Sequence, residues 1–144
     1  MRSLYYYFSA LIIAALFVVS CKTQNTQKAS TDITGKTWKL TELNGKPIEL
    51  KNPKNNPYFK LEMDGMRYQG HAGCNGLGGT FEIKPEVMTI KFNQGMSTMM
   101  ACEDLDIENQ FTKAILAADN YSVNGNTLTL NKARMAPLAK FVLQ

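Results

Sequence analysis

The stretch GHAGCNGLGG, residues 70–79, decides the fold expected for this chain, because it places Cys74 and Asn75 among five glycines. Glycine-rich backbone reaches positive φ angles and lets neighbouring segments approach closely, so the stretch predicts a sharp corner or bulge between strands. A phosphate-binding loop needs a following helix, usually with Lys and Ser or Thr, whereas residues 80–83 (TFEI) are typical of a strand. The sequence therefore favours a structural corner over a nucleotide site.

The segments on both sides of this corner alternate apolar and polar residues, which is the pattern of half-buried antiparallel strands. Residues 37–43 (TWKLTEL) place Trp38 and Leu40 on one face, and residues 58–63 place Phe59, Leu61 and Met63 on one face. Asn-Gly and Asp-Gly pairs between such segments indicate hairpin turns. Further strands are expected at 88–92, at 96–101 and towards the end of the chain.

Residues 103–119 break the alternation and predict the one sizeable helix of the domain, with acidic residues at its start, where the helix dipole favours them. The apolar residues at helical spacing are Ile107, Phe111, Ala114, Ile115 and Ala118. About eight strands and one helix predict a mainly β (α+β) domain. We expect a curved antiparallel sheet or incomplete β-barrel whose open side the helix covers, with a two-sheet sandwich as the alternative.

The start of the chain has the pattern of a secretory signal. Arg2 precedes an apolar segment, residues 8–19, which is too short for a spanning helix of about 20 residues. The ending Val-Val-Ser-Cys resembles a bacterial lipobox, which implies that Cys21 is acylated and becomes the mature N-terminus. We therefore expect a lipoprotein signal peptide at 1–20, a polar flexible tether at 21–34 and one domain at 35–144.

Charge and cysteine usage narrow the possible partners. Removal of residues 1–20 would leave fifteen basic and twelve acidic residues, interspersed along the chain, which argues against nucleic-acid binding. With Cys21 assigned to lipid, Cys74 and Cys102 remain as an even pair in an exported domain, which predicts a disulfide. Closing a loop of about 29 residues would stabilise the fold by about 3 to 4 kcal/mol.

The order of these signals resembles the META domain family, also called HslJ-like after a bacterial heat-shock lipoprotein. The residues that carry the resemblance are Trp38, Leu40, Gly70, Gly73, Cys74, Asn75, Thr98, Met99, Ala101, Cys102, Glu108, Phe111, Leu128 and Leu130. The resemblance implies an exported, often lipid-anchored protein with a half-barrel of antiparallel strands and a helix. Some members have been likened to lipid-binding pilot lipoproteins, and the family implies no catalytic residues.

Chemical sites have weak support in the sequence. His71 is the only histidine and lies beside glycines, where a half-exposed strand position is the simpler interpretation. Carboxylates at Asp104, Asp106 and Glu108 lack the turn glycine and the bidentate ligand of a calcium loop. Methionines 96, 99 and 100 with Cys102 would offer soft ligands to Cu(I), but strand alternation divides them between two faces. A redox role for the cysteines lacks a Cys-x-x-Cys motif. We expect no enzyme activity, metal or cofactor.

Two classes of function remain open. The first is a lipid-anchored envelope module, at the outer membrane on its periplasmic or surface face, that binds an unknown envelope protein or supports the envelope under stress. The second is a carrier that holds a lipid or other apolar ligand between the sheet and the helix. In a carrier, the contacts would come from Ile107, Phe111 and Ile115, which share one helix face.

Overall fold

The computed structural model describes residues 32–134 and 136–144 of the chain. The predicted signal peptide, the lipidation site at Cys21 and most of the predicted tether lie outside the described residues. The strands are β1 (Thr37–Leu43), β2 (Lys46–Pro47), β3 (Tyr58–Glu62), β4 (Arg67–His71), β5 (Gly76–Lys84), β6 (Thr89–Ser97), β7 (Asn120–Asn124), β8 (Thr127–Lys132) and β9 (Ala136–Leu143). Three short 3₁₀ turns (Pro53–Asn55, Asp64–Met66, Pro85–Val87) and the helix α2 (Leu105–Ala117) complete the described elements.

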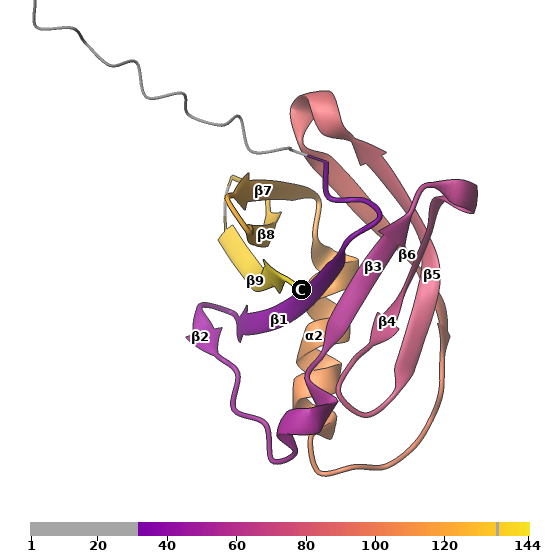
Figure 1. Cartoon of the computed structure of the whole chain (residues 1–144), viewed down its shortest axis with the longest axis vertical. Coiled ribbons are helices and arrows are strands. Elements are labelled where there is room, and N and C mark those ends of the chain that lie inside the picture. Colours follow the sequence, from indigo (N-terminus) through magenta and orange to yellow (C-terminus); the bar gives the residue numbers. More distant parts are fainter. Residues whose placement is uncertain (1–31, 135) are drawn as a thin grey trace, which may run out of the picture.

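All nine strands belong to one antiparallel sheet that curves into a ring (Figure 1). The order is β2-β1-β3-β4-β5-β6-β7-β8-β9, and β1 also pairs with β9, from Trp38 opposite Leu143 to Leu43 opposite Ala139. The mainly β class with a strongly curved sheet is thus confirmed, with nine strands instead of about eight. The two-sheet sandwich is wrong, because the strands form one continuous sheet.

One junction of the ring is weak, and the helix lies beside it. Strands β6 and β7 pair only at Thr89 and Asn120. The chain between these strands forms α2, which packs against β6 and β9 (Figure 1). Among the described residues, no helix combines the length and the apolarity needed to cross a bilayer.

The interior of the ring is packed with aromatic side chains. Phe59 contacts Phe141 edge to face, with ring centroids 4.8 Å apart, and Phe92 at 5.9 Å. Phe111 brings the helix into the same cluster, 6.0 Å from Phe141. Such edge-to-face pairs add to the free energy of burying the rings. Trp38 and Leu40 of β1, Phe59 and Leu61 of β3 and Phe111 of α2 are buried, as predicted. Met63 was predicted on the same face as Phe59 but is 56% exposed, because β3 ends at Glu62.

The folded part begins earlier than residue 35, the start predicted from the sequence. Ile33 is fully buried, and its carbonyl oxygen accepts a hydrogen bond from Trp38 Nε1 at 2.8 Å. Gly35 donates its N–H to the Leu61 carbonyl oxygen at 2.8 Å. The prediction of a tether through residue 34 is therefore wrong for residues 32–34, because one apolar side chain in a polar segment fills the core beside Trp38.

The predicted glycine corner is also shorter than residues 70–79. Gly70 lies in β4 and residues 76–79 lie in β5, so the corner consists of residues 72–75. Gly70 allows β4 to lie close to β3, because a Cβ there would collide with the Tyr58 carbonyl oxygen. The glycines thus serve close strand approach as well as turning, and only Gly73, with φ of 115°, needs the left-handed region.

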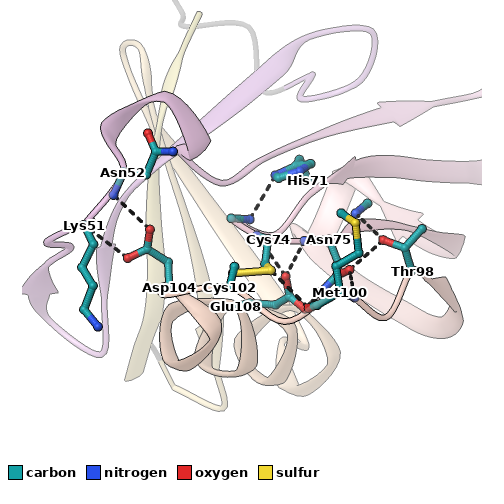
Figure 2. The surroundings of a disulfide bond; sticks show 12 residues. Lys51, Asn52, His71, Cys74, Asn75, Thr98, Met100, Cys102, Asp104 and Glu108 are labelled. Atoms are coloured by element: carbon teal, nitrogen blue, oxygen red, sulfur yellow. Dashed lines mark hydrogen bonds between the residues drawn. A yellow bond between two sulfur atoms is a disulfide. The ribbon is translucent and has the colours of Figure 1, made fainter.

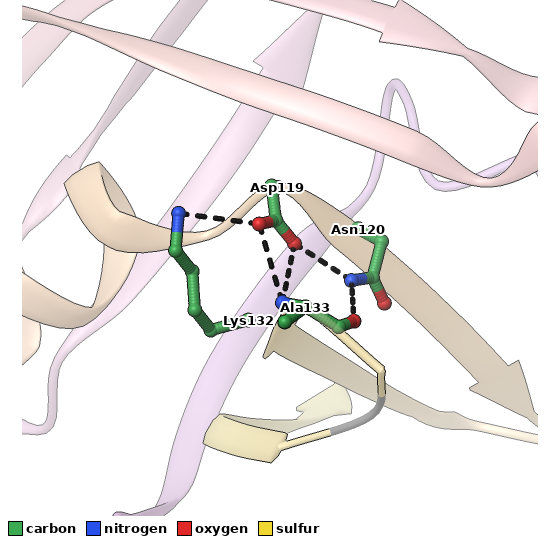
Figure 3. Close-up of polar contacts among 4 residues, drawn as sticks. All are labelled: Asp119, Asn120, Lys132 and Ala133. Carbon is green, nitrogen blue, oxygen red and sulfur yellow. Dashed lines mark hydrogen bonds and ion pairs between the residues drawn. The ribbon is translucent and has the colours of Figure 1, made fainter.

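Asp119 joins the start of β7 to the turn between β8 and β9 (Figure 3). Its carboxylate accepts the Ala133 N–H at 2.9 Å and the Asn120 side-chain amide at 2.7 Å, and it forms an ion pair with Lys132 at 3.2 Å. The Ala133 N–H is the main cause of the lowered pKa of Asp119, and Lys132 and Asn120 lower that pKa further.

Candidate functional site

The corner after β4 and the loop after β6 are joined by the disulfide between Cys74 and Cys102 (Figure 2). The two Cα atoms are 5.8 Å apart, and the bond links positions 28 residues apart in sequence. The predicted pairing is therefore confirmed. The bond joins two of the motif segments, residues 73–75 and 98–102, at the N-terminal end of α2.

Asn75 forms the centre of this site, and each polar atom of its side chain makes two hydrogen bonds (Figure 2). Its Nδ2 donates to the Met100 carbonyl oxygen at 3.1 Å and to Glu108 Oε1 at 2.7 Å. Its Oδ1 accepts the Thr98 hydroxyl at 2.8 Å and the Met100 N–H at 2.7 Å. Since a side-chain amide offers two donors and two acceptor positions, this buried residue is completely satisfied.

Glu108 holds the other side of the same network. Its Oε2 accepts the Asn75 N–H at 2.6 Å and the Cys74 N–H at 3.1 Å, so the carboxylate faces only donors. Asp104, one helical turn earlier, accepts the N–H groups of Lys51 at 2.8 Å and Asn52 at 3.1 Å. Hydrogen bonds to charged groups contribute more than neutral ones, so the two carboxylates fix two loops onto α2.

These two carboxylates do not serve the helix dipole, as the sequence had suggested. Acidic residues at a helix start suit the dipole, but Asp104 and Glu108 are buried and bind backbone N–H groups of other segments. A signal was present, because positions 104, 108, 111 and 115 recur at the spacing of one helix face, which is the buried face. Carboxylates on a core-facing stripe indicate structural hydrogen bonding.

Three methionines close to this network in the sequence face solvent. Met99 is 99% exposed and Met96 is 88% exposed, while Met100 is 60% exposed even though its backbone is fixed by Asn75. Beside the loop lies an open groove of about 880 Å³, whose second wall is α2. Leu105, Lys113 and Leu116 contribute to that wall. A fixed loop with exposed apolar side chains therefore lies next to a partly apolar groove.

The predicted ligand contacts lie elsewhere. Phe111 and Ile115 are buried in the core, and Ile107 packs against it from a half-buried position. None of these three residues lines the groove. Trp38 is likewise a core residue, on β1. The structure thus divides the motif into core positions and a second group at the disulfide: Gly73, Cys74, Asn75, Thr98, Met99, Ala101, Cys102 and Glu108.

The side chains weighed for chemistry have structural partners. His71, at the end of β4, accepts the Gly73 N–H through Nδ1 at 3.2 Å and stacks on Tyr58, with ring centroids 6.4 Å apart. The Cys102 sulfur is bonded to Cys74, so in this state it is no thiolate ligand or nucleophile. Within the described residues, no group of three or more His, Cys, Asp or Glu side chains has the geometry to hold a metal ion.

Comparisons with known proteins agree with this fold. A family model described as META domain matches residues 31–144. A solved structure of a DUF4847 family protein from Bacteroides vulgatus is 17% identical with a TM-score of 0.58, and the match covers 76% of this chain and 93% of that one. An NMR structure of a protein from Burkholderia xenovorans is 18% identical with a TM-score of 0.61, covering 78% and 83%. No curated protein matches the chain. At these identities, the two structures support the fold alone.

Proposed function

The chain belongs to the META domain family, and from this membership and the site at the disulfide we propose that it is a lipid-anchored envelope protein that binds a partner protein without catalysing a reaction. Family membership favours an envelope protein of non-enzymatic type. The partner-binding role is supported by the geometry of loop 98–102, and the anchor is supported by the sequence around Cys21.

One observation carries the proposed binding role: buried polar bonds and a disulfide hold a loop whose apolar side chains face solvent. Met99 and Met100 contribute little to the core, yet the chain on both sides of Met99 is held: Thr98 bonds Gly76 and Asn75, and Asn75 bonds the Met100 backbone. Exposed apolar side chains on a fixed backbone favour association, because little conformational entropy is then lost on binding. Methionine also adapts to varied partner surfaces, and it is common at such sites.

The proposed anchor rests on the segment Val-Val-Ser-Cys at residues 18–21. After cleavage, two or more acyl chains on Cys21 would hold the protein at a membrane, where one chain alone binds marginally. Fractionation of cells should find the wild type in the membrane and Cys21→Ser unprocessed or released into solution. Lys22→Gln, which keeps the thiol, should behave as wild type. A membrane-bound mature form of Cys21→Ser would contradict the anchor.

In-cell photo-crosslinking tests the partner role directly. A photoreactive amino acid at position 99 should give discrete adducts with one protein. At position 87 it should give none, because Val87 is also exposed but lies on the turn before β6. Equal adducts from both positions, or none from position 99, would end the proposal.

The alternative, a carrier of an apolar ligand between sheet and helix, has less support. Phe111 and Ile115 are occupied by core contacts, and small curved sheets usually fill their interior with side chains. The two roles differ in what removal of the Phe111 side chain does to stability and to bound lipid.

A further inference from the structure

We propose that the groove between residues 98–101 and α2 receives an extended peptide segment of the partner, which pairs as a strand with Met99 and Ala101 and places a carboxylate at Lys113. This inference rests on the proposed function and names the partner's chemistry. It is carried by three features: unpaired backbone groups at strand spacing, an apolar wall on α2, and a cation that lacks an ion pair.

Residues 98–101 follow directly after β6, and their backbone groups alternate between bonded and unbonded residues. Thr98 donates its N–H to the Gly76 carbonyl oxygen at 3.2 Å, and the N–H and C=O of Met100 bond to the Asn75 side chain. The backbone groups of Met99 and Ala101 have no hydrogen-bond partner among the described residues. Groups two residues apart on one edge match the hydrogen-bond spacing of an added antiparallel strand.

Within the described residues, the edge of β6 opposite β5 has no strand partner beyond its start, because β7 pairs with β6 only at Thr89. Ile90 still donates its N–H to the Asp119 carbonyl oxygen at 3.2 Å. Beyond it, α2 takes the place of a neighbouring strand, and its buried face points into the core. A helix offers no ladder of hydrogen bonds to a strand, so the segment after β6 keeps the free backbone groups of Met99 and Ala101.

The helix wall determines which side chains the peptide would carry. Leu105 and Leu116 offer apolar contact, and Lys113 lies between them on the groove side. No ion pair of Lys113 is present in the part of the chain that the structure describes. The other charged residue at the groove, Glu108, is saturated by the N–H groups of Cys74 and Asn75 and by the Asn75 amide. The free charge of the groove is thus positive, which favours an acidic side chain or a C-terminal carboxylate.

A displayed library of random dodecapeptides with free carboxyl termini tests the inference on the protein purified as cells produce it, with its disulfide intact. Selected peptides should alternate apolar and other residues, and their binding should depend on an acidic side chain or on the C-terminal carboxylate. Lys113→Gln should weaken their binding by about threefold to tenfold. Lys91→Gln should leave binding unchanged, because this exposed lysine of β6 does not line the groove. Equal effects of the two substitutions would overturn the role of Lys113.

Methylation of single peptide nitrogens tests the strand pairing. Methyl groups at every second position should abolish binding of a selected peptide, whereas methyl groups at the intervening positions should have little effect. Equal sensitivity at all positions, selection of helical peptides or failure to select any peptide would overturn the extended mode. The partner role would survive each of these results if position 99 still gave discrete adducts in cells, so the two proposals fail separately.

Discussion

Single buried residues of the domain differ in how well their polar atoms are satisfied: Asn75 lies at the candidate site, and Tyr121 lies on β7. Asn75 and Tyr121 are each 2% exposed. The Asn75 side chain makes four hydrogen bonds, whereas the Tyr121 hydroxyl has no partner among the described residues. Because an unsatisfied buried polar atom costs more than a hydrogen bond gains, substitutions at the two kinds of position should have opposite effects.

Glu108→Gln should destabilise the protein, although it changes one atom. Every group that faces the carboxylate is a donor, so the new amide NH₂ must lie against a backbone N–H or against the Asn75 amide. We expect a loss of about 1 to 3 kcal/mol in the free energy of unfolding, measured by urea denaturation. Glu103→Gln, at an exposed position just before the helix, should change it little. Equal stability of the two variants would contradict the role of Glu108.

Tyr121→Phe should preserve or raise stability. It removes a buried hydroxyl without a partner, and the gain should be up to about 1 kcal/mol in the free energy of unfolding. Tyr68→Phe is the matched control, because that hydroxyl donates to the Asn93 carbonyl oxygen at 3.1 Å. Its removal should cost about 1 kcal/mol. A clear loss of stability in Tyr121→Phe would reveal a hydrogen-bond acceptor for that hydroxyl in solution.

Asp119 should contribute to the loss of stability in acid. Its pKa is lower in the folded protein than the ordinary value of 3.8, chiefly because of the Ala133 N–H. Its contribution is therefore present above that ordinary value and is lost as pH falls through the folded pKa. Asp119→Asn should flatten the acid limb of a pH–stability curve. Lys132→Gln should retain most of the acid loss of stability, because the Ala133 N–H remains. An unchanged pH–stability curve in Asp119→Asn would refute the contribution of Asp119.

At the scale of elements, local patterns predicted the helix better than the strand ends. The helix was expected at 103–119 and spans Leu105–Ala117, because its apolar stripe and acidic start are local signals. Segments 88–92 and 96–101 were expected as two strands, yet β6 is one strand, Thr89–Ser97. Gly95 lies between the two expected segments and against β5 at a register shift, where a Cβ would collide with the Gly78 carbonyl oxygen.

Gly70→Ala and Gly76→Ala should show whether the strands need glycine only where they lie close together. A Cβ at position 70 would press on the Tyr58 carbonyl oxygen and force β3 from β4, at a cost of about 1 to 3 kcal/mol. A Cβ at position 76 meets nothing nearer than the Gly70 carbonyl oxygen at 3.9 Å, so the change should stay within about 0.5 kcal/mol. Thermal unfolding measures both, and equal melting temperatures would contradict the steric explanation.

At the scale of the whole molecule, ring closure was beyond the reach of sequence reasoning. The pairing of Trp38 with Leu143 joins the two ends of the domain, and no local pattern encodes so distant a contact. The sequence predicted only part of the candidate site. The motif segments and the disulfide were found from residue types, but the network around Asn75 depends on the position of α2 over the corner. The groove likewise depends on a tertiary feature, because α2 and not β7 lies beside the end of β6.

Phe111→Ala tests whether the interior of the ring is a filled core or a ligand site, because this side chain joins the helix to the sheet. Phe111 is fully buried and contacts Phe141 of β9. If the interior is a filled core, the substitution should cost about 3 to 5 kcal/mol of unfolding free energy. Thr112→Ala, the next residue and part of the groove wall, should change stability little.

In a carrier of apolar ligands, the same substitution would enlarge a site instead of opening a void. The cost would then be smaller, and the lipid that co-purifies with the protein would change in amount or chain length, as native mass spectrometry detects. We expect the full core penalty and no bound lipid in either form. A small penalty together with altered lipid occupancy would favour the carrier. The groove beside Met99 would then lose its place as the main candidate site, because the ligand would lie on the opposite face of α2.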